Sequence, residues 1–380
     1  MISLPLRFQR LSTIQFWRNL WRDTSPTLGS GGRCRSARRS LVWFLLAALL
    51  LHAGAILVLD ELRPGARDPE YARRVRQLRA RLAENPRRPL VLVIGSSRSA
   101  MGICPAEWEA VRPNSPNNRD PVIFNMSLLG GGPVMELLTL RRIYTDGVRP
   151  ELVLLEYWPP HLHWEGGWAE PGRIAPDRLY PVDRPIVREY FPDPARTERL
   201  MRTYRWNPFF AARNRLLVQL APKWLPNTKR LDWTWDTVDS WGWKPGFDYP
   251  PGLTEQRTQL LGTCRETYRP LFTGFQLSRD ADRAIRQAVA EARAHGSRVG
   301  FVYLPEASEF RSWYPPRVEQ MVQDHLAALS RELAVPVLDA RLWMDDGWFV
   351  DGFHLSRNGA RVFTRKFGPA VAAFCREVRP

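Results

Sequence analysis

Residues 90–98 read Leu-Val-Leu-Val-Ile-Gly-Ser-Ser-Arg, an apolar run that stops at a glycine and two serines. A short, continuous aliphatic run of this kind is typical of a strand buried on both faces of a parallel sheet. Four further apolar runs follow in the chain and are also predicted to be strands: 121–124, 152–155, 299–304 and 335–338.

Segments with helical periodicity lie between these runs, at 134–144, 280–294, 317–333 and 361–378. Strands that alternate with helices predict an α/β fold with a doubly wound parallel sheet. In such a sheet the ligand site lies outside the carboxyl ends of the strands. We therefore expect the functional residues directly after strands.

One long interruption, 159–277, separates the third predicted strand from the next helix, far beyond ordinary loop length. This predicts an insertion that forms a subdomain or a lid. With the tryptophan at its edge it holds nine of the sixteen tryptophans, among them Trp233, Trp235, Trp241 and Trp243. Trp241 and Trp243 are candidate substrate-binding residues that stack on sugar rings; packing in a small core is the alternative.

The composition limits the class of partner. The 380 residues are 44% hydrophobic and 25% charged, enough for one large domain or two ordinary ones. The net charge is +16, and 51 of the 55 basic residues are arginines. These form no block of the kind that follows phosphates, so nucleic acid is not an expected partner.

An uncharged apolar stretch, 41–59, has about the length that crosses roughly 30 Å of hydrocarbon, and we interpret it as one transmembrane helix. Four arginines in 33–40 against two in 60–67 favour a cytoplasmic N-terminal segment, 1–40, and an exported C-terminal domain at the inner membrane. A cleaved signal peptide is the alternative, because Ala53-Gly54-Ala55 resembles a cleavage site, although forty preceding residues are too long for an ordinary one.

Residues 60–88 are predicted to be a juxtamembrane spacer with a basic helix, which leaves 89–380 as the domain that contains the insertion. Cys34 would lie in the cytoplasm. Cys104, Cys264 and Cys375 would lie outside it and allow one disulfide, whose pairing stays open.

Three motifs hold candidate catalytic residues. Gly95-Ser96-Ser97 follows the first strand, and Asn125 with a glycine run at 130–132 follows the second. Asp351 and His354 precede the last helix, and an acid at this spacing can orient an imidazole that activates a hydroxyl. Taken singly, each motif also has a structural interpretation, as a helix cap, a helix-entry turn or a structural histidine.

Together the motifs resemble the SGNH, or GDSL-type, hydrolase superfamily. Ser97 matches the nucleophile, Asn125 and Gly130 match the second block, and Asp351 with His354 matches the last block. The resemblance implies an SGNH hydrolase-like three-layer fold, a catalytic triad of Ser97, His354 and Asp351, and no cofactor. The family's asparagine after the third strand is missing, which leaves the N–H groups of Ser97 and Gly130 as the oxyanion donors.

The variant blocks resemble the membrane-anchored branch that modifies cell-envelope polymers, such as the teichoic-acid D-alanylation and alginate O-acetylation proteins. This implies a membrane-anchored serine esterase or O-acyltransferase that acts outside the cytoplasm on an acylated carbohydrate or related ester. A membrane-bound acyl-donor protein is an implied partner. The alternative is a non-catalytic binding or assembly protein of the cell envelope, which the missing asparagine favours.

Further candidates for substrate binding are Arg98, Asn125, Glu306 and Arg311, which follow the predicted strands. Glu306 and Arg311 have an ordinary alternative as ion-paired or solvated loop residues. His161 and His163 stand beside Glu165, but without further ligands we prefer a structural interpretation and expect no metal.

Overall fold

The computed structural model describes residues 30–62, 64–112, 120–163, 170, 174–225, 237–246 and 254–377. The chain divides into two compact units, 1–55 and 56–380. Helix α2 (Ser30–Leu57) is the described element of the first unit. Its part Ala37–Leu57 contains an 18-residue window with a mean hydropathy of 2.2 and is long and apolar enough to cross a membrane, in agreement with the predicted span 41–59.

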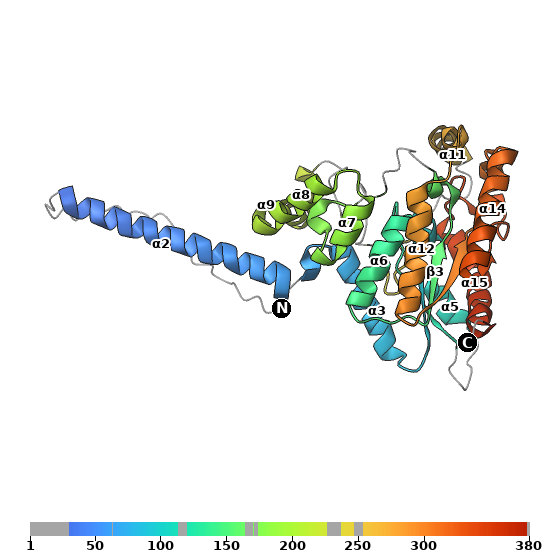
Figure 1. The fold of residues 1–380 in the computed structure, drawn as a ribbon, viewed down its shortest axis with the longest axis horizontal. Helices are drawn as coiled ribbons and strands as arrows, with labels where there is room; N and C mark the ends of the chain where they lie inside the picture. The colour runs from blue at the N-terminus through green and yellow to red at the C-terminus, as the bar shows by residue number, and fades with distance from the viewer. Residues whose placement is uncertain are drawn as a thin grey trace, which may run out of the picture. The chain divides into compact units, whose positions relative to one another are not determined.

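The second unit is built around a parallel five-stranded sheet (Figure 1). The strands lie in the order β2-β1-β3-β4-β5, a doubly wound arrangement in which the strand order reverses between β1 and β3. All five predicted strands are present: β1 (Leu90–Ile94), β2 (Val122–Asn125), β3 (Leu152–Glu156), β4 (Arg298–Tyr303) and β5 (Val337–Asp339). The prediction of a parallel α/β sheet is confirmed.

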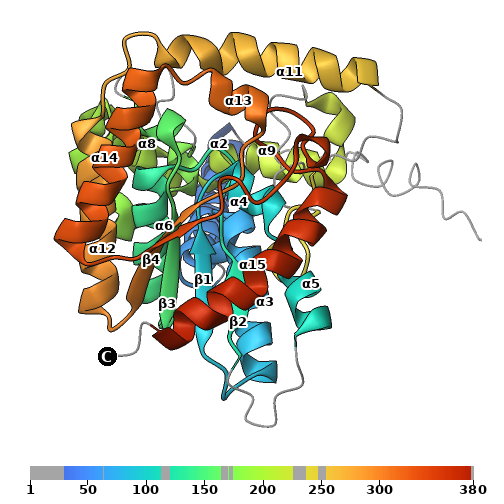
Figure 2. The same cartoon turned by 90° about the vertical axis from the view of Figure 1, so that its right-hand side faces the viewer.

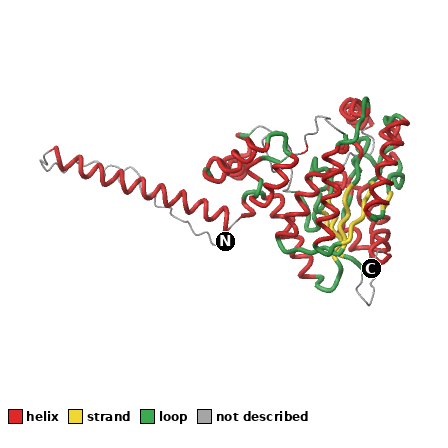
Figure 3. Tube along the Cα trace, viewed as in Figure 1, coloured by secondary structure: helices red, strands yellow, loops and turns green. Residues whose placement is uncertain are grey.

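The sheet is buried on both faces, which explains why its strands are apolar without alternation. Leu92 and Ile94 of β1 belong to one hydrophobic cluster, whereas Val91 and Val93 belong to the other. Figure 3 shows the strands between layers of helices. One cluster includes residues of α3 (Pro69–Glu84), α6 (Pro133–Thr145), α12 (Arg279–Ala294) and α14 (Pro316–Leu333); the other includes residues of α5 (Pro105–Val111) and α15 (Arg357–Glu377).

Helix α3, which was expected in a spacer ahead of the domain, packs inside the second unit. Its Tyr71, Val75 and Leu78 are buried in the core. Arg74 is fully buried and donates hydrogen bonds to the carbonyls of Asn125 and Gly242. The compact unit therefore begins well before residue 89, because the basic helix has an apolar face that the sheet covers.

The inserted segment contributes helices to the same unit. It contains the helices α7 (Arg184–Tyr190), α8 (Pro194–Trp206), α9 (Pro208–Leu220) and α11 (Thr254–Tyr268). Figure 2 shows α11 crossing above the sheet with the short helix α13 (Ser308–Ser312) beneath it, while α4 (Ser97–Gly102) follows β1. Part of the segment 159–277 thus lies on the side of the sheet where the strands end.

The described tryptophans of the segment 237–246 pack against the sheet. The carbonyl of Trp241 accepts a hydrogen bond from the N–H of Asn125 at 3.1 Å. Trp243 is buried, and its indole N–H donates to the carbonyl of Met101 at 2.7 Å. The buried side chain of Trp243 supports the packing interpretation, and the side chain of Trp241 is partly buried against the core. Trp233 and Trp235 lie outside the described residues.

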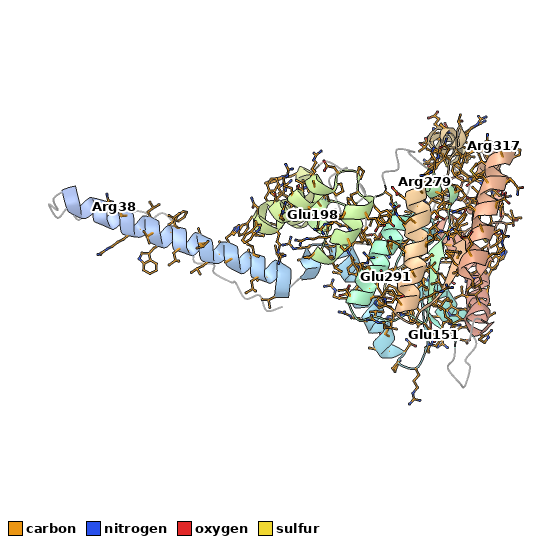
Figure 4. The ribbon with its side chains drawn as sticks, in the orientation of Figure 1. Arg38, Glu151, Glu198, Arg279, Glu291 and Arg317 are labelled. Atoms are coloured by element: carbon orange, nitrogen blue, oxygen red, sulfur yellow. The ribbon has the colours of Figure 1, made fainter. Side chains whose placement is uncertain are left out.

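Much of the arginine-rich surface is ion-paired. Glu151 and Glu291 lie on the outside of the unit (Figure 4), where they pair with Arg298 at 2.7 Å and Arg141 at 3.0 Å. Cys104, Cys264 and Cys375 are buried and lie in three separate parts of the chain. Burial raises the pKa of the Cys104 thiol to about 12.

We expect Gly242→Ala to destabilise the protein more than Gly274→Ala does. Both glycines have positive φ (+83° and +72°), which costs an alanine about 1–2 kcal/mol. A Cβ at Gly242 would also lie 1.9 Å from the carbonyl oxygen of Asn125, whereas one at Gly274 would meet nothing within 4 Å. Urea unfolding of both variants measures the difference, and equal losses would contradict docking of 237–246 on β2.

Candidate active site

The turn after β1 presents Ser97 as the first residue of α4. Ser96 caps this helix, because its hydroxyl accepts the N–H of Arg98 at 3.1 Å. Gly95 is required by close packing: a Cβ there would lie 2.4 Å from a carboxylate oxygen of Glu156 and 2.5 Å from the hydroxyl of Ser99. The strand-to-helix turn therefore places a serine hydroxyl at the carboxyl edge of the sheet.

The structure brings Ser97, His354 and Asp351 together in one hydrogen-bonded row. Nε2 of His354 lies 2.8 Å from Oγ of Ser97. Nδ1 of the same ring lies 2.8 Å from Oδ2 of Asp351. Because 257 positions separate the serine from the histidine, only the fold joins them. The row has the geometry of a nucleophile, a base and a group that orients the base.

Asp351 is held as a carboxylate. Its Oδ1 accepts the backbone N–H groups of Phe353 at 2.8 Å and His354 at 2.7 Å. Burial by itself would raise the pKa of Asp351, but the imidazole of His354 and the two N–H donors hold this pKa below its ordinary value. A charged carboxylate favours the tautomer with hydrogen on Nδ1, which leaves Nε2 to accept the serine proton.

The loop after β2 lies next to the nucleophile turn. The N–H of Leu128 donates to the carbonyl of Gly95 at 3.0 Å, and Gly130 has a positive φ of +73°. Among the described residues, no hydrogen bond engages the backbone N–H of Ser97 or of Gly130. Ser97 and Gly130 are the two residues predicted to supply the oxyanion donors. Both backbone N–H groups can therefore donate to a ligand.

Glu156 ends β3 directly behind the nucleophile turn. Its carboxylate accepts the N–H of Ser96 at 2.7 Å and the Ser96 hydroxyl at 3.1 Å, and it also accepts the hydroxyl of Ser99. Glu156 was not among the predicted site residues. The available signal was a charged residue at the end of an otherwise apolar strand, where burial of the charge demands several partners.

The predicted substrate-binding residues Arg98, Asn125 and Glu306 are buried. Arg98 donates to the carbonyl of Leu304 at 2.8 Å and lies between Glu156 at 3.5 Å and Glu306 at 3.7 Å. The Asn125 amide donates to the carbonyls of Ser99 and Ile103, both at 2.8 Å.

These contacts favour a structural role for the three buried side chains. Arg311 is partly exposed and donates to the carbonyl of Glu306. Among the four polar residues predicted to bind substrate, Arg311 is therefore the one with an accessible side chain.

Aromatic side chains near both ends of the segment 159–277 pack beside His354. The ring of Tyr268, at the end of α11, lies 4.7 Å from Phe353, and Trp158 lies 4.8 Å from the same ring. The carboxylate of Glu170 accepts three N–H groups at the start of α6, those of Gly132, Val134 and Met135. Burial raises the pKa of Glu170 to about 7, against the lowering effect of these donors.

The two histidines after β3 make aromatic contacts. The ring of His161 lies edge-on to Trp158, with centroids 4.7 Å apart, and His163 stacks on Phe275 at 5.1 Å. Glu165, the third member of the weighed metal set, lies outside the described residues. In the described part of the chain, no group of three or more possible ligand side chains gathers in a way that would hold a metal ion.

We expect Glu156→Gln to lower the free energy of unfolding by about 3–5 kcal/mol, the cost of breaking a buried ion pair. The NH₂ group of the new glutamine would also face the N–H and O–H groups of Ser96 and Ser99, which are themselves donors. Glu151→Gln is the matched control near the other end of β3, where a half-exposed ion pair with Arg298 should contribute about 1 kcal/mol or less. Urea unfolding compares the two, and similar losses would contradict the role given to Glu156.

The geometry of the site is the basis for assigning it a function. No model of a known protein family matches the chain, and no curated protein matches it.

Proposed function

We propose that the protein is a membrane-anchored serine esterase or O-acyltransferase that acts outside the cytoplasm. The observation that carries this proposal is the row formed by Ser97, His354 and Asp351, with contacts of 2.8 Å at both steps. A serine hydroxyl is inert at neutral pH until a base removes its proton, and this row provides that base. The resemblance to SGNH hydrolases adds support.

The proposed reaction proceeds in two steps. Ser97 Oγ attacks an ester carbonyl while His354 Nε2 takes the hydroxyl proton, and the N–H groups of Ser97 and Gly130 stabilise the tetrahedral oxyanion. The intermediate collapses to an acyl-serine, and His354 returns the proton to the leaving alcohol. Water or an acceptor hydroxyl then removes the acyl group by the reverse sequence, which makes the outcome hydrolysis or transfer.

The proposed substrate is an acylated carbohydrate of the cell envelope or a related ester. The spanning-length helix α2 supports it, because a tethered enzyme meets substrates at the membrane surface. The resemblance to the envelope-modifying branch supports it as well. In the transfer reaction, a membrane-bound acyl-donor protein would be the partner.

We expect Ser97→Ala, His354→Ala and Asp351→Asn each to reduce covalent labelling by a fluorophosphonate by orders of magnitude. The losses should not add in double variants, because each change disables the same unit. Circular dichroism and thermal unfolding would verify that each variant is folded. The labelling rate of the full chain in detergent or vesicles is the measurement.

Ser96→Ala is the matched control for these variants. Its hydroxyl caps α4 and donates to the buried carboxylate of Glu156, so its loss should cost about 1–3 kcal/mol of stability and leave the labelling within a few-fold of the native rate. Labelling that survives Ser97→Ala but not Ser96→Ala would contradict the assignment. A folded native chain that is never labelled would instead favour a non-catalytic binding or assembly role.

We expect the protein to sediment with membranes through 41–59 and to expose its C-terminal domain outside the cytoplasm. Four arginines in 33–40 against two in 60–67 favour this orientation. Protease added to intact spheroplasts should digest a C-terminal tag and spare an N-terminal one. The opposite pattern would overturn the orientation, and a soluble mature chain that begins near residue 57 would overturn the anchor.

A further inference from the structure

Two helices of the insertion carry an exposed aromatic surface that the site does not use. We define the α8–α9 patch by its exposed apolar side chains: Trp206, Phe209, Phe210, Leu220 and Trp224. Leu220 and Trp224 are 82% and 78% exposed. On the surface of a soluble protein, large apolar side chains usually occur singly. Five of them on α8, α9 and the turn that follows α9 indicate a surface that meets an apolar medium.

Helical geometry places the three patch residues of α9 on one side of that helix. At about 100° per residue, Phe209, Phe210 and Leu220 fall within an arc of about 100°. Ala211, on the opposite side of the helix, is buried against the unit. Figure 1 shows α8 and α9 on the far side of the unit from α14 and α15. The spacing of these residues along α9 therefore turns the apolar side of the helix away from the core.

The same segment is strongly basic. Residues 194–224 contain seven basic residues and one acidic residue, Glu198, which pairs with Arg188 at 2.6 Å. Arg213 lies over the ring of Phe210, with 3.5 Å between its guanidinium carbon and the ring centroid. Arginine and lysine beside tryptophan, phenylalanine and leucine is the composition of helices that lie in a lipid interface.

The short connection between α2 and α3 limits how far the folded unit can lie from the membrane that would hold α2. Helix α2 ends at Leu57, and α3, which is part of the folded core, begins at Pro69. The intervening residues, 58–68, reach at most about 40 Å when fully extended. A chain anchored through α2 therefore cannot move its folded unit far from the headgroups.

We propose that the α8–α9 patch inserts into the headgroup and acyl boundary of the membrane that anchors the chain, and prefers anionic lipid. The inference rests on the membrane anchor proposed above and does not depend on the chemistry of Ser97. Its consequence is that the insertion holds the catalytic unit in a fixed orientation on the lipid surface. Apolar side chains supply insertion, and the basic residues supply attraction to anionic headgroups.

The test uses the full chain with Cys34→Ser, in vesicles of phosphatidylcholine and phosphatidylglycerol. A polarity-sensitive fluorophore is attached at Leu220→Cys, and at Arg317→Cys on α14 as the control (Figure 4). We expect the label at 220 to shift to the blue and to lose most of its emission to spin-labelled lipid. The label at 317 should show neither change.

Equal responses at the two positions would overturn the proposal. A blue shift at 220 without quenching by lipid would also overturn it, because a second copy or another protein would then cover the patch. Vesicle flotation checks the anchor separately: a chain that does not float refutes the anchor and this proposal, while fluorophosphonate labelling of Ser97 would be unaffected.

A charge reversal tests the preference for anionic lipid. Arg199→Glu with Arg213→Glu should reduce lipid quenching at 220 several-fold, whereas Arg279→Glu with Arg317→Glu, exposed arginines on α12 and α14, should not. Equal effects of the two pairs would contradict a specific role for the basic residues of the patch.

Discussion

The carboxylate of Glu156 is the constraint on which the site depends. It sits at the carboxyl end of the central strand β3, is nearly inaccessible to water, and accepts hydrogen bonds from Ser96 and Ser99. A charge in such a place is tolerated only when several donors surround it. Those donors belong to the turn that begins α4, so satisfying the carboxylate also fixes the backbone that presents Ser97.

Further buried ion pairs connect Glu156 to residues that lie farther from Ser97. Arg98 lies between Glu156 and Glu306, and Arg341 contacts Glu306 at 2.9 Å. The guanidinium of Arg98 also lies 5.1 Å from the ring of Trp158, which packs on Phe353, the residue before His354. The turn at Ser97 and the loop at His354 are thereby supported by the same packed layer, beneath the carboxyl edge of the sheet.

The sequence predicted the strands because an apolar run buried on both faces carries a strong local signal. It also predicted the pairing of Asp351 with His354, whose spacing of three residues makes the contact local. The role of Glu156 could not be predicted, since its partners lie some sixty positions away. Arg98 and Asn125 were predicted to be site residues for the same reason: the distant partners that bury them cannot be seen in the local sequence. Helix α3 was predicted to be a spacer because its many basic residues make its apolar face hard to recognise.

The central claim is that His354 makes Ser97 nucleophilic. Peptide mass spectrometry of the native chain after reaction with a fluorophosphonate tests it most directly, because it locates the adduct without any substitution. The account predicts one phosphonylated residue, Ser97, and no adduct on the neighbouring Ser96 or Ser99. An adduct on either neighbour, or a folded chain with no adduct at all, would contradict it.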